Sequence, residues 1–130
     1  MSSAGIKSAW NLALKLCLAG ILLFAALGSA FANPVPRLVD VGADKCIPCI
    51  KMAPILDQLK KDFAGRMEVK FVDAWKNQEE AAGYGVRMIP TQIFYAADGK
   101  ELFRHTGFFS REEILGKWLE LGYSFDTGKP

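Results

Sequence analysis

Apolar and polar residues follow one another along this chain in blocks that predict strands and helices in turn. Short apolar runs bounded by glycine or charged residues are typical of buried strands. The first such run, Arg37 to Val41, is apolar except at Asp40, as expected for a strand inside a parallel sheet. The complete set of runs predicts four strands, at 37–41, 67–72, 91–95 and 102–106.

A long helix is predicted between the first two strands, from Ile47 to Phe63. Its apolar residues recur at the three- and four-residue spacing of one helix face. Pro54 lies inside this pattern and cannot donate a backbone hydrogen bond. We therefore expect a kink near Ile50, with a division into two helices at Pro54 as the alternative.

Two further helices are expected from their N-terminal capping signals. Asn77 with Glu80 predicts a capping box before a short helix that ends at Ala82, and Ser110 with Glu113 predicts a second box before the last helix. The apolar stripe of the last helix consists of Ile114, Leu115, Trp118, Leu119 and Leu121.

The element order is therefore β-α-β-α-β-β-α, which indicates an α/β fold with a mixed central sheet of about four strands. Helices should flank this sheet. Functional groups in such sheets gather at the carboxyl ends of strands and at helix N-termini. The loop after the first strand, at 42–45, and the helix start that follows it are thus the first place to search for chemistry.

Residues 1–32 have the pattern of an export signal. Lys7 and Lys15 precede an apolar run from Leu16 to Leu27, and Ala30-Phe31-Ala32 matches a small-x-small cleavage site. We expect cleavage after Ala32 and an extracytoplasmic, periplasmic-type location. The alternative is a retained membrane anchor, although the run from 16 to 31 is shorter than the ~20 residues of a typical spanning helix.

The rest of the chain is expected to form one domain at 33–123, followed by a loose tail at 124–130. The chain has 130 residues, 51% of them hydrophobic, which is enough for one compact core. Its net charge of +2 comes from Lys7 and Lys15, so the remainder is neutral. This balance gives no reason to expect nucleic acid as a partner, and a monomer is predicted.

The chemistry of the chain is expected at Cys46-Ile47-Pro48-Cys49. On a helix the two cysteines would lie on one face, roughly 5–6 Å apart at Cβ, so a disulfide could form with a small adjustment. The helix N-terminus and Lys45 favour a thiolate at Cys46, the expected nucleophile, with a pKa below the free value of about 8.5. Cys49 is then the resolving thiol.

Two other interpretations of this motif are open. A CxxC pair can be half of a zinc site, but zinc needs about four ligands and the mature chain adds only His105 to the two cysteines. The pair could also form a permanent structural disulfide, although so short a ring restrains little chain entropy. We expect no metal and no cofactor.

Further short motifs give the chain its resemblance to the thioredoxin superfamily, which covers about Leu38 to Leu121. They follow in the family's order and spacing: Val39-Asp40, Cys46-Ile47-Pro48-Cys49, Lys51-Met52-Ala53-Pro54-Ile55-Leu56-Asp57, Tyr84-Gly85-Val86-Arg87, Ile89-Pro90-Thr91 and Gly107. The resemblance implies a thioredoxin fold and thiol–disulfide exchange with protein substrates.

The resemblance also implies roles for individual residues. Asp40 matches the family's buried acid, which takes and returns the proton of the resolving thiol. Pro90 would follow a cis peptide bond beside the cysteines, with Ile89 offering backbone hydrogen bonds to a substrate. The remaining residues expected to bind substrate are Ile47, Pro48 and Gly107.

The chain departs from the family pattern at two places around the cysteines. Lys45 replaces the usual tryptophan, and Ile47-Pro48 replaces Gly-Pro. Asp40 and Ile89 resemble those of reducing members, which indicates an exported reductase supplied with electrons by a membrane thiol carrier. A disulfide oxidant or isomerase on the same fold and a non-catalytic binding module are the alternatives. His105 is expected at the surface, and Trp75 has no assigned role.

Overall fold

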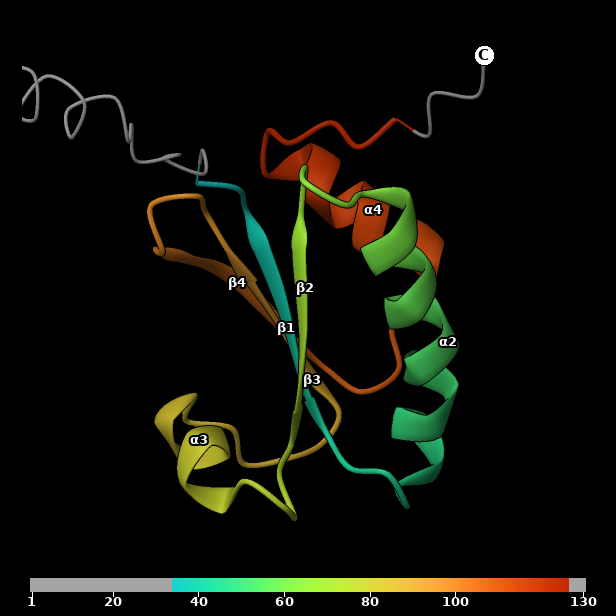
Figure 1. The fold of residues 1–130 in the computed structure, drawn as a ribbon, viewed down its shortest axis with the longest axis vertical. Helices are drawn as coiled ribbons and strands as arrows, with labels where there is room; N and C mark the ends of the chain where they lie inside the picture. Colours follow the sequence, from blue (N-terminus) through green and yellow to red (C-terminus); the bar gives the residue numbers. More distant parts are fainter. Residues whose placement is uncertain (1–33, 127–130) are drawn as a thin grey trace, which may run out of the picture. The chain divides into compact units, whose positions relative to one another are not determined.

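A computed structural model describes residues 34–126, which form a four-stranded mixed sheet (Figure 1). The strands are β1 (Arg37–Gly42), β2 (Glu68–Asp73), β3 (Thr91–Tyr95) and β4 (Glu101–Thr106), and their order in the sheet is β2-β1-β3-β4. β1 pairs in parallel with β2 and antiparallel with β3, and β3 pairs antiparallel with β4. The mixed sheet predicted from the sequence is confirmed.

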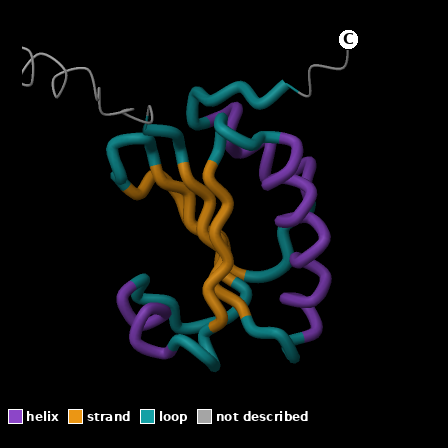
Figure 2. Tube along the Cα trace, viewed as in Figure 1, coloured by secondary structure: helices purple, strands orange, loops and turns teal. Residues whose placement is uncertain are grey.

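Three helices cover the two faces of this sheet. α2 (Ile47–Asp62) and α4 (Arg111–Glu120) lie on one face, and the short α3 (Gln78–Gly83) lies on the other (Figures 1 and 2). The connection from β1 through α2 to β2 is the crossover that a parallel pair requires. The order of elements is the βαβαββα predicted from the sequence.

The larger core fills the space between the sheet and the pair α2 and α4. Aromatic rings dominate it, because Phe94 lies 4.8 Å from Trp118 and 5.6 Å from Phe103 between ring centroids. Burial of such rings stabilises the fold most per residue. The buried members are Leu38, Met52, Leu56, Leu59, Phe63, Met67, Val69, Phe94, Phe109, Ile114 and Trp118.

The smaller core lies under α3 on the opposite face of the sheet. It is built from β-branched and small residues. Because side chains alternate along each strand, Val39 and Ile93 point to this face while their neighbours Leu38 and Phe94 point to the other. Its buried members are Val39, Val41, Val72, Ala81 and Ile93. Because β1 and β3 contribute to both cores, they are buried on both faces.

Details of the helices decide three open predictions. α2 continues through Pro54, so the alternative of two separate helices is wrong. Ser110 and Glu113 form the predicted capping box at the start of α4. The box predicted at Asn77 does not form, because Glu80 instead reaches across to Lys70 on β2 at 2.5 Å.

The segment after α4 differs from its prediction as a loose tail. Phe125 packs against Phe63 and Trp118, with ring centroids 5.3 Å and 5.5 Å apart, and Arg66 donates to the carbonyl of Asp126 at 3.1 Å. The ring of Phe125 therefore packs against two members of the larger core, although the residues around it in the sequence are mostly polar. The predictions for residues 1–33, including the signal peptide, the anchor and Cys17, and for 127–130 lie outside the described residues.

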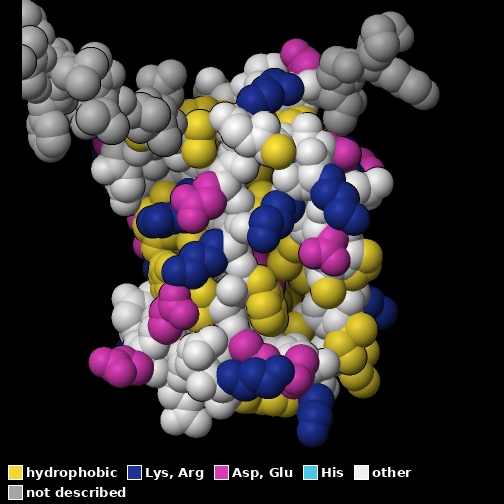
Figure 3. Space-filling model, viewed as in Figure 1, with side chains coloured by type: hydrophobic (Ala, Val, Ile, Leu, Met, Phe, Trp, Pro, Cys, Tyr) yellow, Lys and Arg dark blue, Asp and Glu magenta, His cyan; other side chains and the backbone are white. Residues whose placement is uncertain are grey.

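The surface of the described part mixes both signs of charge. On the face shown in Figure 3, Lys and Arg side chains alternate with Asp and Glu, and hydrophobic atoms appear between them. Within the described part, some charged side chains form ion pairs, such as Arg111 with Asp62 at 2.8 Å. None of the helices within 34–126 combines the length and apolar character needed to cross a membrane.

Candidate active site

The two cysteines of the CxxC motif form a disulfide at the N-terminus of α2. Cys46 is the N-cap residue, with extended backbone angles, and Cys49 lies in the first turn. Their Cα atoms are 5.1 Å apart, within the range that a disulfide needs. Pro48 lies between them in the first turn, where its missing N–H leaves no helical hydrogen bond unmade.

The two sulfur-bearing residues differ in their exposure to solvent. Cys49 is 3% exposed, whereas Cys46 is half-buried and the neighbouring Ile47 is 73% exposed. A partner molecule can therefore reach Cys46 and not Cys49. The first amides of α2 have no partners within the helix, and with the helix dipole they stabilise a negative charge at this end.

Asp40 is a fully buried acid on β1, the strand that leads to the disulfide. Its side chain is 0% exposed, so the possibility that it meets water at the strand end is wrong. Burial raises the pKa of Asp40 from 3.8 to about 6, against a smaller opposing effect from the hydrogen bond that Gln92 donates. A carboxyl group with this pKa can gain and lose a proton near neutrality.

Gly42 provides the space in which Asp40 and Cys49 approach each other. A Cβ atom at this position would lie 3.3 Å from Asp40 Oδ2, 3.4 Å from Cys49 Cβ and 3.0 Å from the ring of Phe71. Any larger residue would have to displace the Phe71 ring. The absence of a side chain at Gly42 therefore brings the buried acid of β1 next to the buried cysteine of α2.

The residues that the sequence predicted to bind substrate lie at the same end of the sheet. The Ile89–Pro90 peptide bond is cis, and Pro90 directly precedes Thr91, which pairs with Val41 near the carboxyl end of β1. Gly107 donates its backbone N–H to the carbonyl of Pro90 at 2.8 Å, with a positive φ of 109° that favours glycine. Pro90 is buried, and Ile89 is half-buried.

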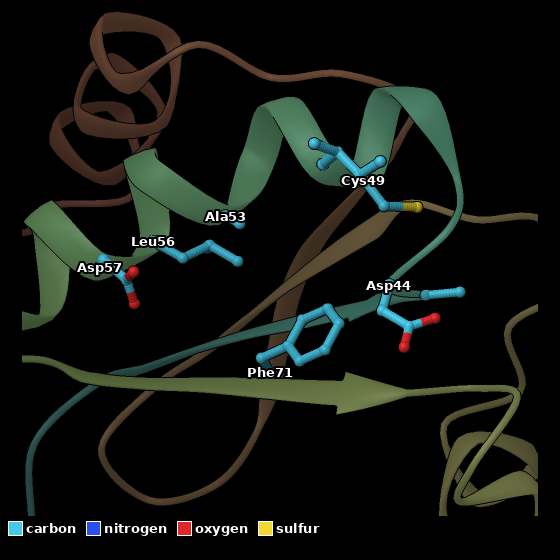
Figure 4. A pocket seen from close by; sticks show the side chains of 8 residues that line it. Asp44, Cys49, Ala53, Leu56, Asp57 and Phe71 are labelled. Atoms are coloured by element: carbon cyan, nitrogen blue, oxygen red, sulfur yellow. The ribbon is translucent and has the colours of Figure 1, made fainter.

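An apolar groove opens beside the disulfide, between α2 and β2. Its volume is about 370 Å³, and Cys49 and Leu56 of α2 line it on one side (Figure 4). Phe71 of β2 faces them from the other side, and Asp44 and Asp57 border it. Phe71, at 48% exposed, separates the groove from the space around Gly42.

Two further residues of the sequence analysis have defined surroundings. His105 on β4 is half-buried rather than fully at the surface, and its ring stacks on Phe109 at 4.1 Å. Trp75 is 54% exposed, and its backbone N–H bonds to Asp73 at 2.9 Å. Within residues 34–126, no group of three or more His, Cys, Asp or Glu residues lies close enough together to hold a metal ion.

Sequence reasoning missed one residue of this site, Gln92 on β3. Its Nε2 donates to Asp40 Oδ1 at 2.7 Å, and its side chain is 0% exposed. The signal was present, because Gln92 interrupts the apolar run of β3 just as Asp40 interrupts that of β1. Only the pairing of β1 with β3 shows that the two interruptions are neighbours.

Comparisons with known proteins agree with this geometry. The family model for thioredoxin matches residues 28–120. The thioredoxin of Staphylococcus aureus is 37% identical over 86 residues, which are 64% of this chain and 82% of that protein. The thioredoxin of Pseudomonas aeruginosa is 35% identical over 79 residues, 61% of this chain and 72% of that protein.

A solved structure supports the same assignment. The thioredoxin of Fasciola hepatica superposes with a TM-score of 0.60 and 31% sequence identity, covering 68% of this chain and 83% of that one. Its likeness includes the mixed sheet with flanking helices. Since the family model matches most of the chain and the CxxC cysteines are joined in a disulfide, the chain belongs to the thioredoxin family and is a thioredoxin-like thiol–disulfide oxidoreductase.

Proposed function

We propose that the protein is an exported reductase that transfers electrons from a membrane thiol carrier to disulfides in protein substrates. Thioredoxins act on thiol or disulfide groups of proteins, and the Cys46–Cys49 disulfide provides the matching chemistry. The observation that carries the proposal is the unequal exposure of the two cysteines. It gives Cys46 the role of attacking an external partner and Cys49 that of completing the reaction.

The reaction begins with the reduced protein. The Cys46 thiolate attacks one sulfur of a substrate disulfide, forming a mixed disulfide and releasing the other substrate sulfur as a thiolate. Cys49, as a thiolate, then attacks Cys46 Sγ, which closes the Cys46–Cys49 disulfide and releases the second substrate sulfur. The substrate gains two electrons, and the protein loses two.

Asp40 is the proposed acid–base group of the second step. Cys49 attacks only as a thiolate, so its proton must leave first, and the carboxylate of Asp40 is the proposed acceptor. When the protein is reduced again, the same carboxyl group returns the proton to Cys49. The burial of Asp40 and its pKa of about 6 support this role.

Substrate is proposed to bind around the exposed side of the disulfide. Ile47 and Met88 are 73% and 68% exposed and would offer apolar contact area to a substrate. The backbone of Ile89 would form hydrogen bonds to an extended substrate segment. Pro48, Pro90 and Gly107 would shape the surface that receives it.

The direction of electron flow is tested by the reduction potential of the Cys46–Cys49 pair, measured by equilibration with glutathione of defined poise. A potential of about −270 mV or lower supports the reductase, because such a dithiol donates electrons readily. A potential of about −120 to −180 mV would contradict it and indicate an oxidant or isomerase. Failure to exchange with any disulfide would indicate a non-catalytic binding module.

Export is proposed from residues 1–32, whose two lysines, apolar run and Ala30-Phe31-Ala32 site match a secretory signal. Outside the cytoplasm no nicotinamide cofactor is at hand, which is why a membrane thiol carrier is the proposed donor. N-terminal sequencing of the protein from its native compartment should give Asn33 as the first residue. A membrane-bound product that keeps 16–31 would contradict cleavage and favour an anchor.

A further inference from the structure

A row of four paired residues crosses the whole sheet beneath the start of α2. Phe71 of β2 pairs with Asp40 of β1, Asp40 pairs with Gln92 of β3, and Gln92 pairs with His105 of β4. Residues paired in register project from the same face of a sheet. The row therefore places two fully buried polar side chains, Asp40 and Gln92, side by side on the face that also holds Cys49.

Gln92 makes one strong contact, and it makes it to Asp40. Its Nε2 donates to Asp40 Oδ1 at 2.7 Å, while Gln92 Oε1 and Asp40 Oδ2 are buried with no hydrogen-bond partner among the described residues. A buried amide with an unsatisfied oxygen destabilises a fold relative to an apolar residue of similar shape. An apolar residue would pack here more favourably, so the amide points to a function.

The two oxygens of Asp40 face different surroundings. Oδ1 is bonded to Gln92, whereas Oδ2 lies 3.3 Å from the position of a Cβ at Gly42, where Cys49 Cβ lies 3.4 Å away. The unbonded oxygen is thus the one that borders the space next to Cys49.

We propose that Gln92 is a positioning residue that fixes the Asp40 carboxyl group, so that Oδ2 is the oxygen that takes and returns the Cys49 proton. This inference rests on the proposed function, in which Asp40 exchanges that proton. An N–H donor at Oδ1 favours negative charge there and leaves Oδ2 as the site of protonation. The proton passes from Cys49 Sγ to Asp40 Oδ2, and Sγ then bonds to the sulfur of Cys46.

Among the groups packed around Asp40, Gln92 is the one that opposes the effect of burial on the pKa of Asp40. Cys49 on α2 is joined to Cys46 in the disulfide and carries no charge, Phe71 on β2 is apolar, and His105 lies beyond Gln92 on β4. The carboxylates of Asp44 and Asp57 border the groove outside Phe71. Burial raises the pKa of Asp40, and the hydrogen bond from Gln92 lowers it, which holds it near neutrality.

The first test is a titration of the Asp40 carboxyl carbon by NMR in the oxidised full chain. Gln92→Leu should raise the pKa of Asp40 by about one pH unit, since a hydrogen bond to a charged group has about that effect. Ile93→Val is the matched control, because it perturbs the neighbouring residue of β3 on the opposite face of the sheet. The control should leave the Asp40 titration unchanged.

The second test separates the two steps of exchange. Reduced protein is mixed with one equivalent of dithiobis(nitrobenzoate), whose coloured thiolate is released once when Cys46 is captured and again when Cys49 closes the disulfide. Gln92→Leu should leave the first release unchanged and slow the second severalfold, with its pH profile moved to higher pH. Gln92→Glu, which places a second acid beside Asp40, should move the profile further in that direction.

The outcomes distinguish this inference from the proposed function. If Asp40→Asn leaves the second release unchanged, Asp40 is not the proton acceptor and the proposed function of Asp40 fails. If Gln92→Leu leaves the Asp40 titration in place, Gln92 does not position it, whatever Asp40 does. If Gln92→Leu slows the second release equally in the Asp40→Asn background, the effect is structural and the inference is overturned.

Discussion

Two regions on the same face of the sheet are equally buried but differently built. Near α4, Phe94 and Trp118 are 0% exposed and pack ring against ring. Beneath the start of α2, Asp40 and Gln92 are also 0% exposed, yet each keeps one polar atom with no partner among the described residues. In the first region, the buried surfaces are mostly apolar and pack against each other. In the second region, the buried residues include polar atoms that lack a hydrogen-bond partner within residues 34–126.

The difference shows that burial has two distinct consequences in this small domain. In the aromatic region it removes apolar surface from water, which lowers the free energy of the folded state. In the polar region it removes solvation from an acid, which raises the pKa of Asp40 to about 6 and lowers stability at neutral pH. The comparison predicts that substitutions in the two regions affect stability and chemistry in opposite ways.

The largest effect is expected from Cys46→Ser, which should abolish disulfide exchange because no thiolate remains to attack a substrate. Stability should change little, since the disulfide closes only a short ring. Cys49→Ser is the matched variant. It should capture substrate and accumulate a mixed disulfide that non-reducing electrophoresis detects. If Cys49→Ser lost capture and Cys46→Ser kept it, the roles of the two cysteines would be reversed.

In the aromatic region, Trp118→Ala should lower the free energy of unfolding by about 3–5 kcal/mol, through lost burial and the cavity left behind. Urea unfolding measures this change. Leu119→Ala is the control on the same helix, because Leu119 is 66% exposed and should cost less than about 0.5 kcal/mol. The folded fraction of Trp118→Ala should exchange disulfides at the normal rate. A slower rate would show that the two regions are coupled.

In the polar region, Asp40→Asn should stabilise the protein and slow its chemistry. The pKa of Asp40 is about 6 in the folded protein and 3.8 when unperturbed, so the folded protein keeps a proton that the unfolded chain loses between about pH 4 and 6. Its free energy of unfolding therefore falls as the pH rises through this window, by about 3 kcal/mol in total. The variant should recover up to that amount at pH 7 and little at pH 4.

The same variant should close its disulfide roughly tenfold more slowly, with the largest effect between about pH 6 and neutrality. This is below the usual contribution of an acid–base group because a thiol can also lose its proton to water. Urea unfolding at several pH values and stopped-flow exchange measure the two effects. Asp57→Asn removes an exposed carboxylate that borders the groove beside the disulfide, and it should alter stability by less than about 0.5 kcal/mol. If Asp40→Asn changed neither stability nor rate, burial of Asp40 would have no consequence for chemistry, and the contrast between the two regions would not hold.

The smallest effect is expected from Ser110→Ala, which removes the capping box of α4. The side chain of Ser110 accepts from the backbone N–H of Glu113, and its loss should cost about 1 kcal/mol. Ser110→Thr keeps a hydroxyl at the cap and should retain most of the stability. Neither variant should change the rate of exchange, and a change would contradict the separation of the two regions.

The sequence by itself predicted most of the architecture because the signals are local. Apolar runs mark the strands, Ser110 with Glu113 marks a helix start, and the CxxC spacing requires only the first turn of a helix. The capping box predicted from the local sequence at Asn77 was wrong, because Glu80 forms an ion pair with Lys70 of β2 instead. The local sequence also failed to predict the place of Phe125, whose ring packs against residues distant in sequence.

The cysteine pair, its place at a helix N-terminus and the acid on the first strand are all readable in the order of residues. The surroundings of that acid are decided by tertiary structure, because Asp40 and Gln92 are 52 positions apart and meet only when β1 pairs with β3. Gly42 likewise matters only because α2 folds back over β1 and brings Cys49 against it. A pKa depends on solvation and on neighbours through space, so folding sets the proton affinity of Asp40, whereas the sequence sets only its presence.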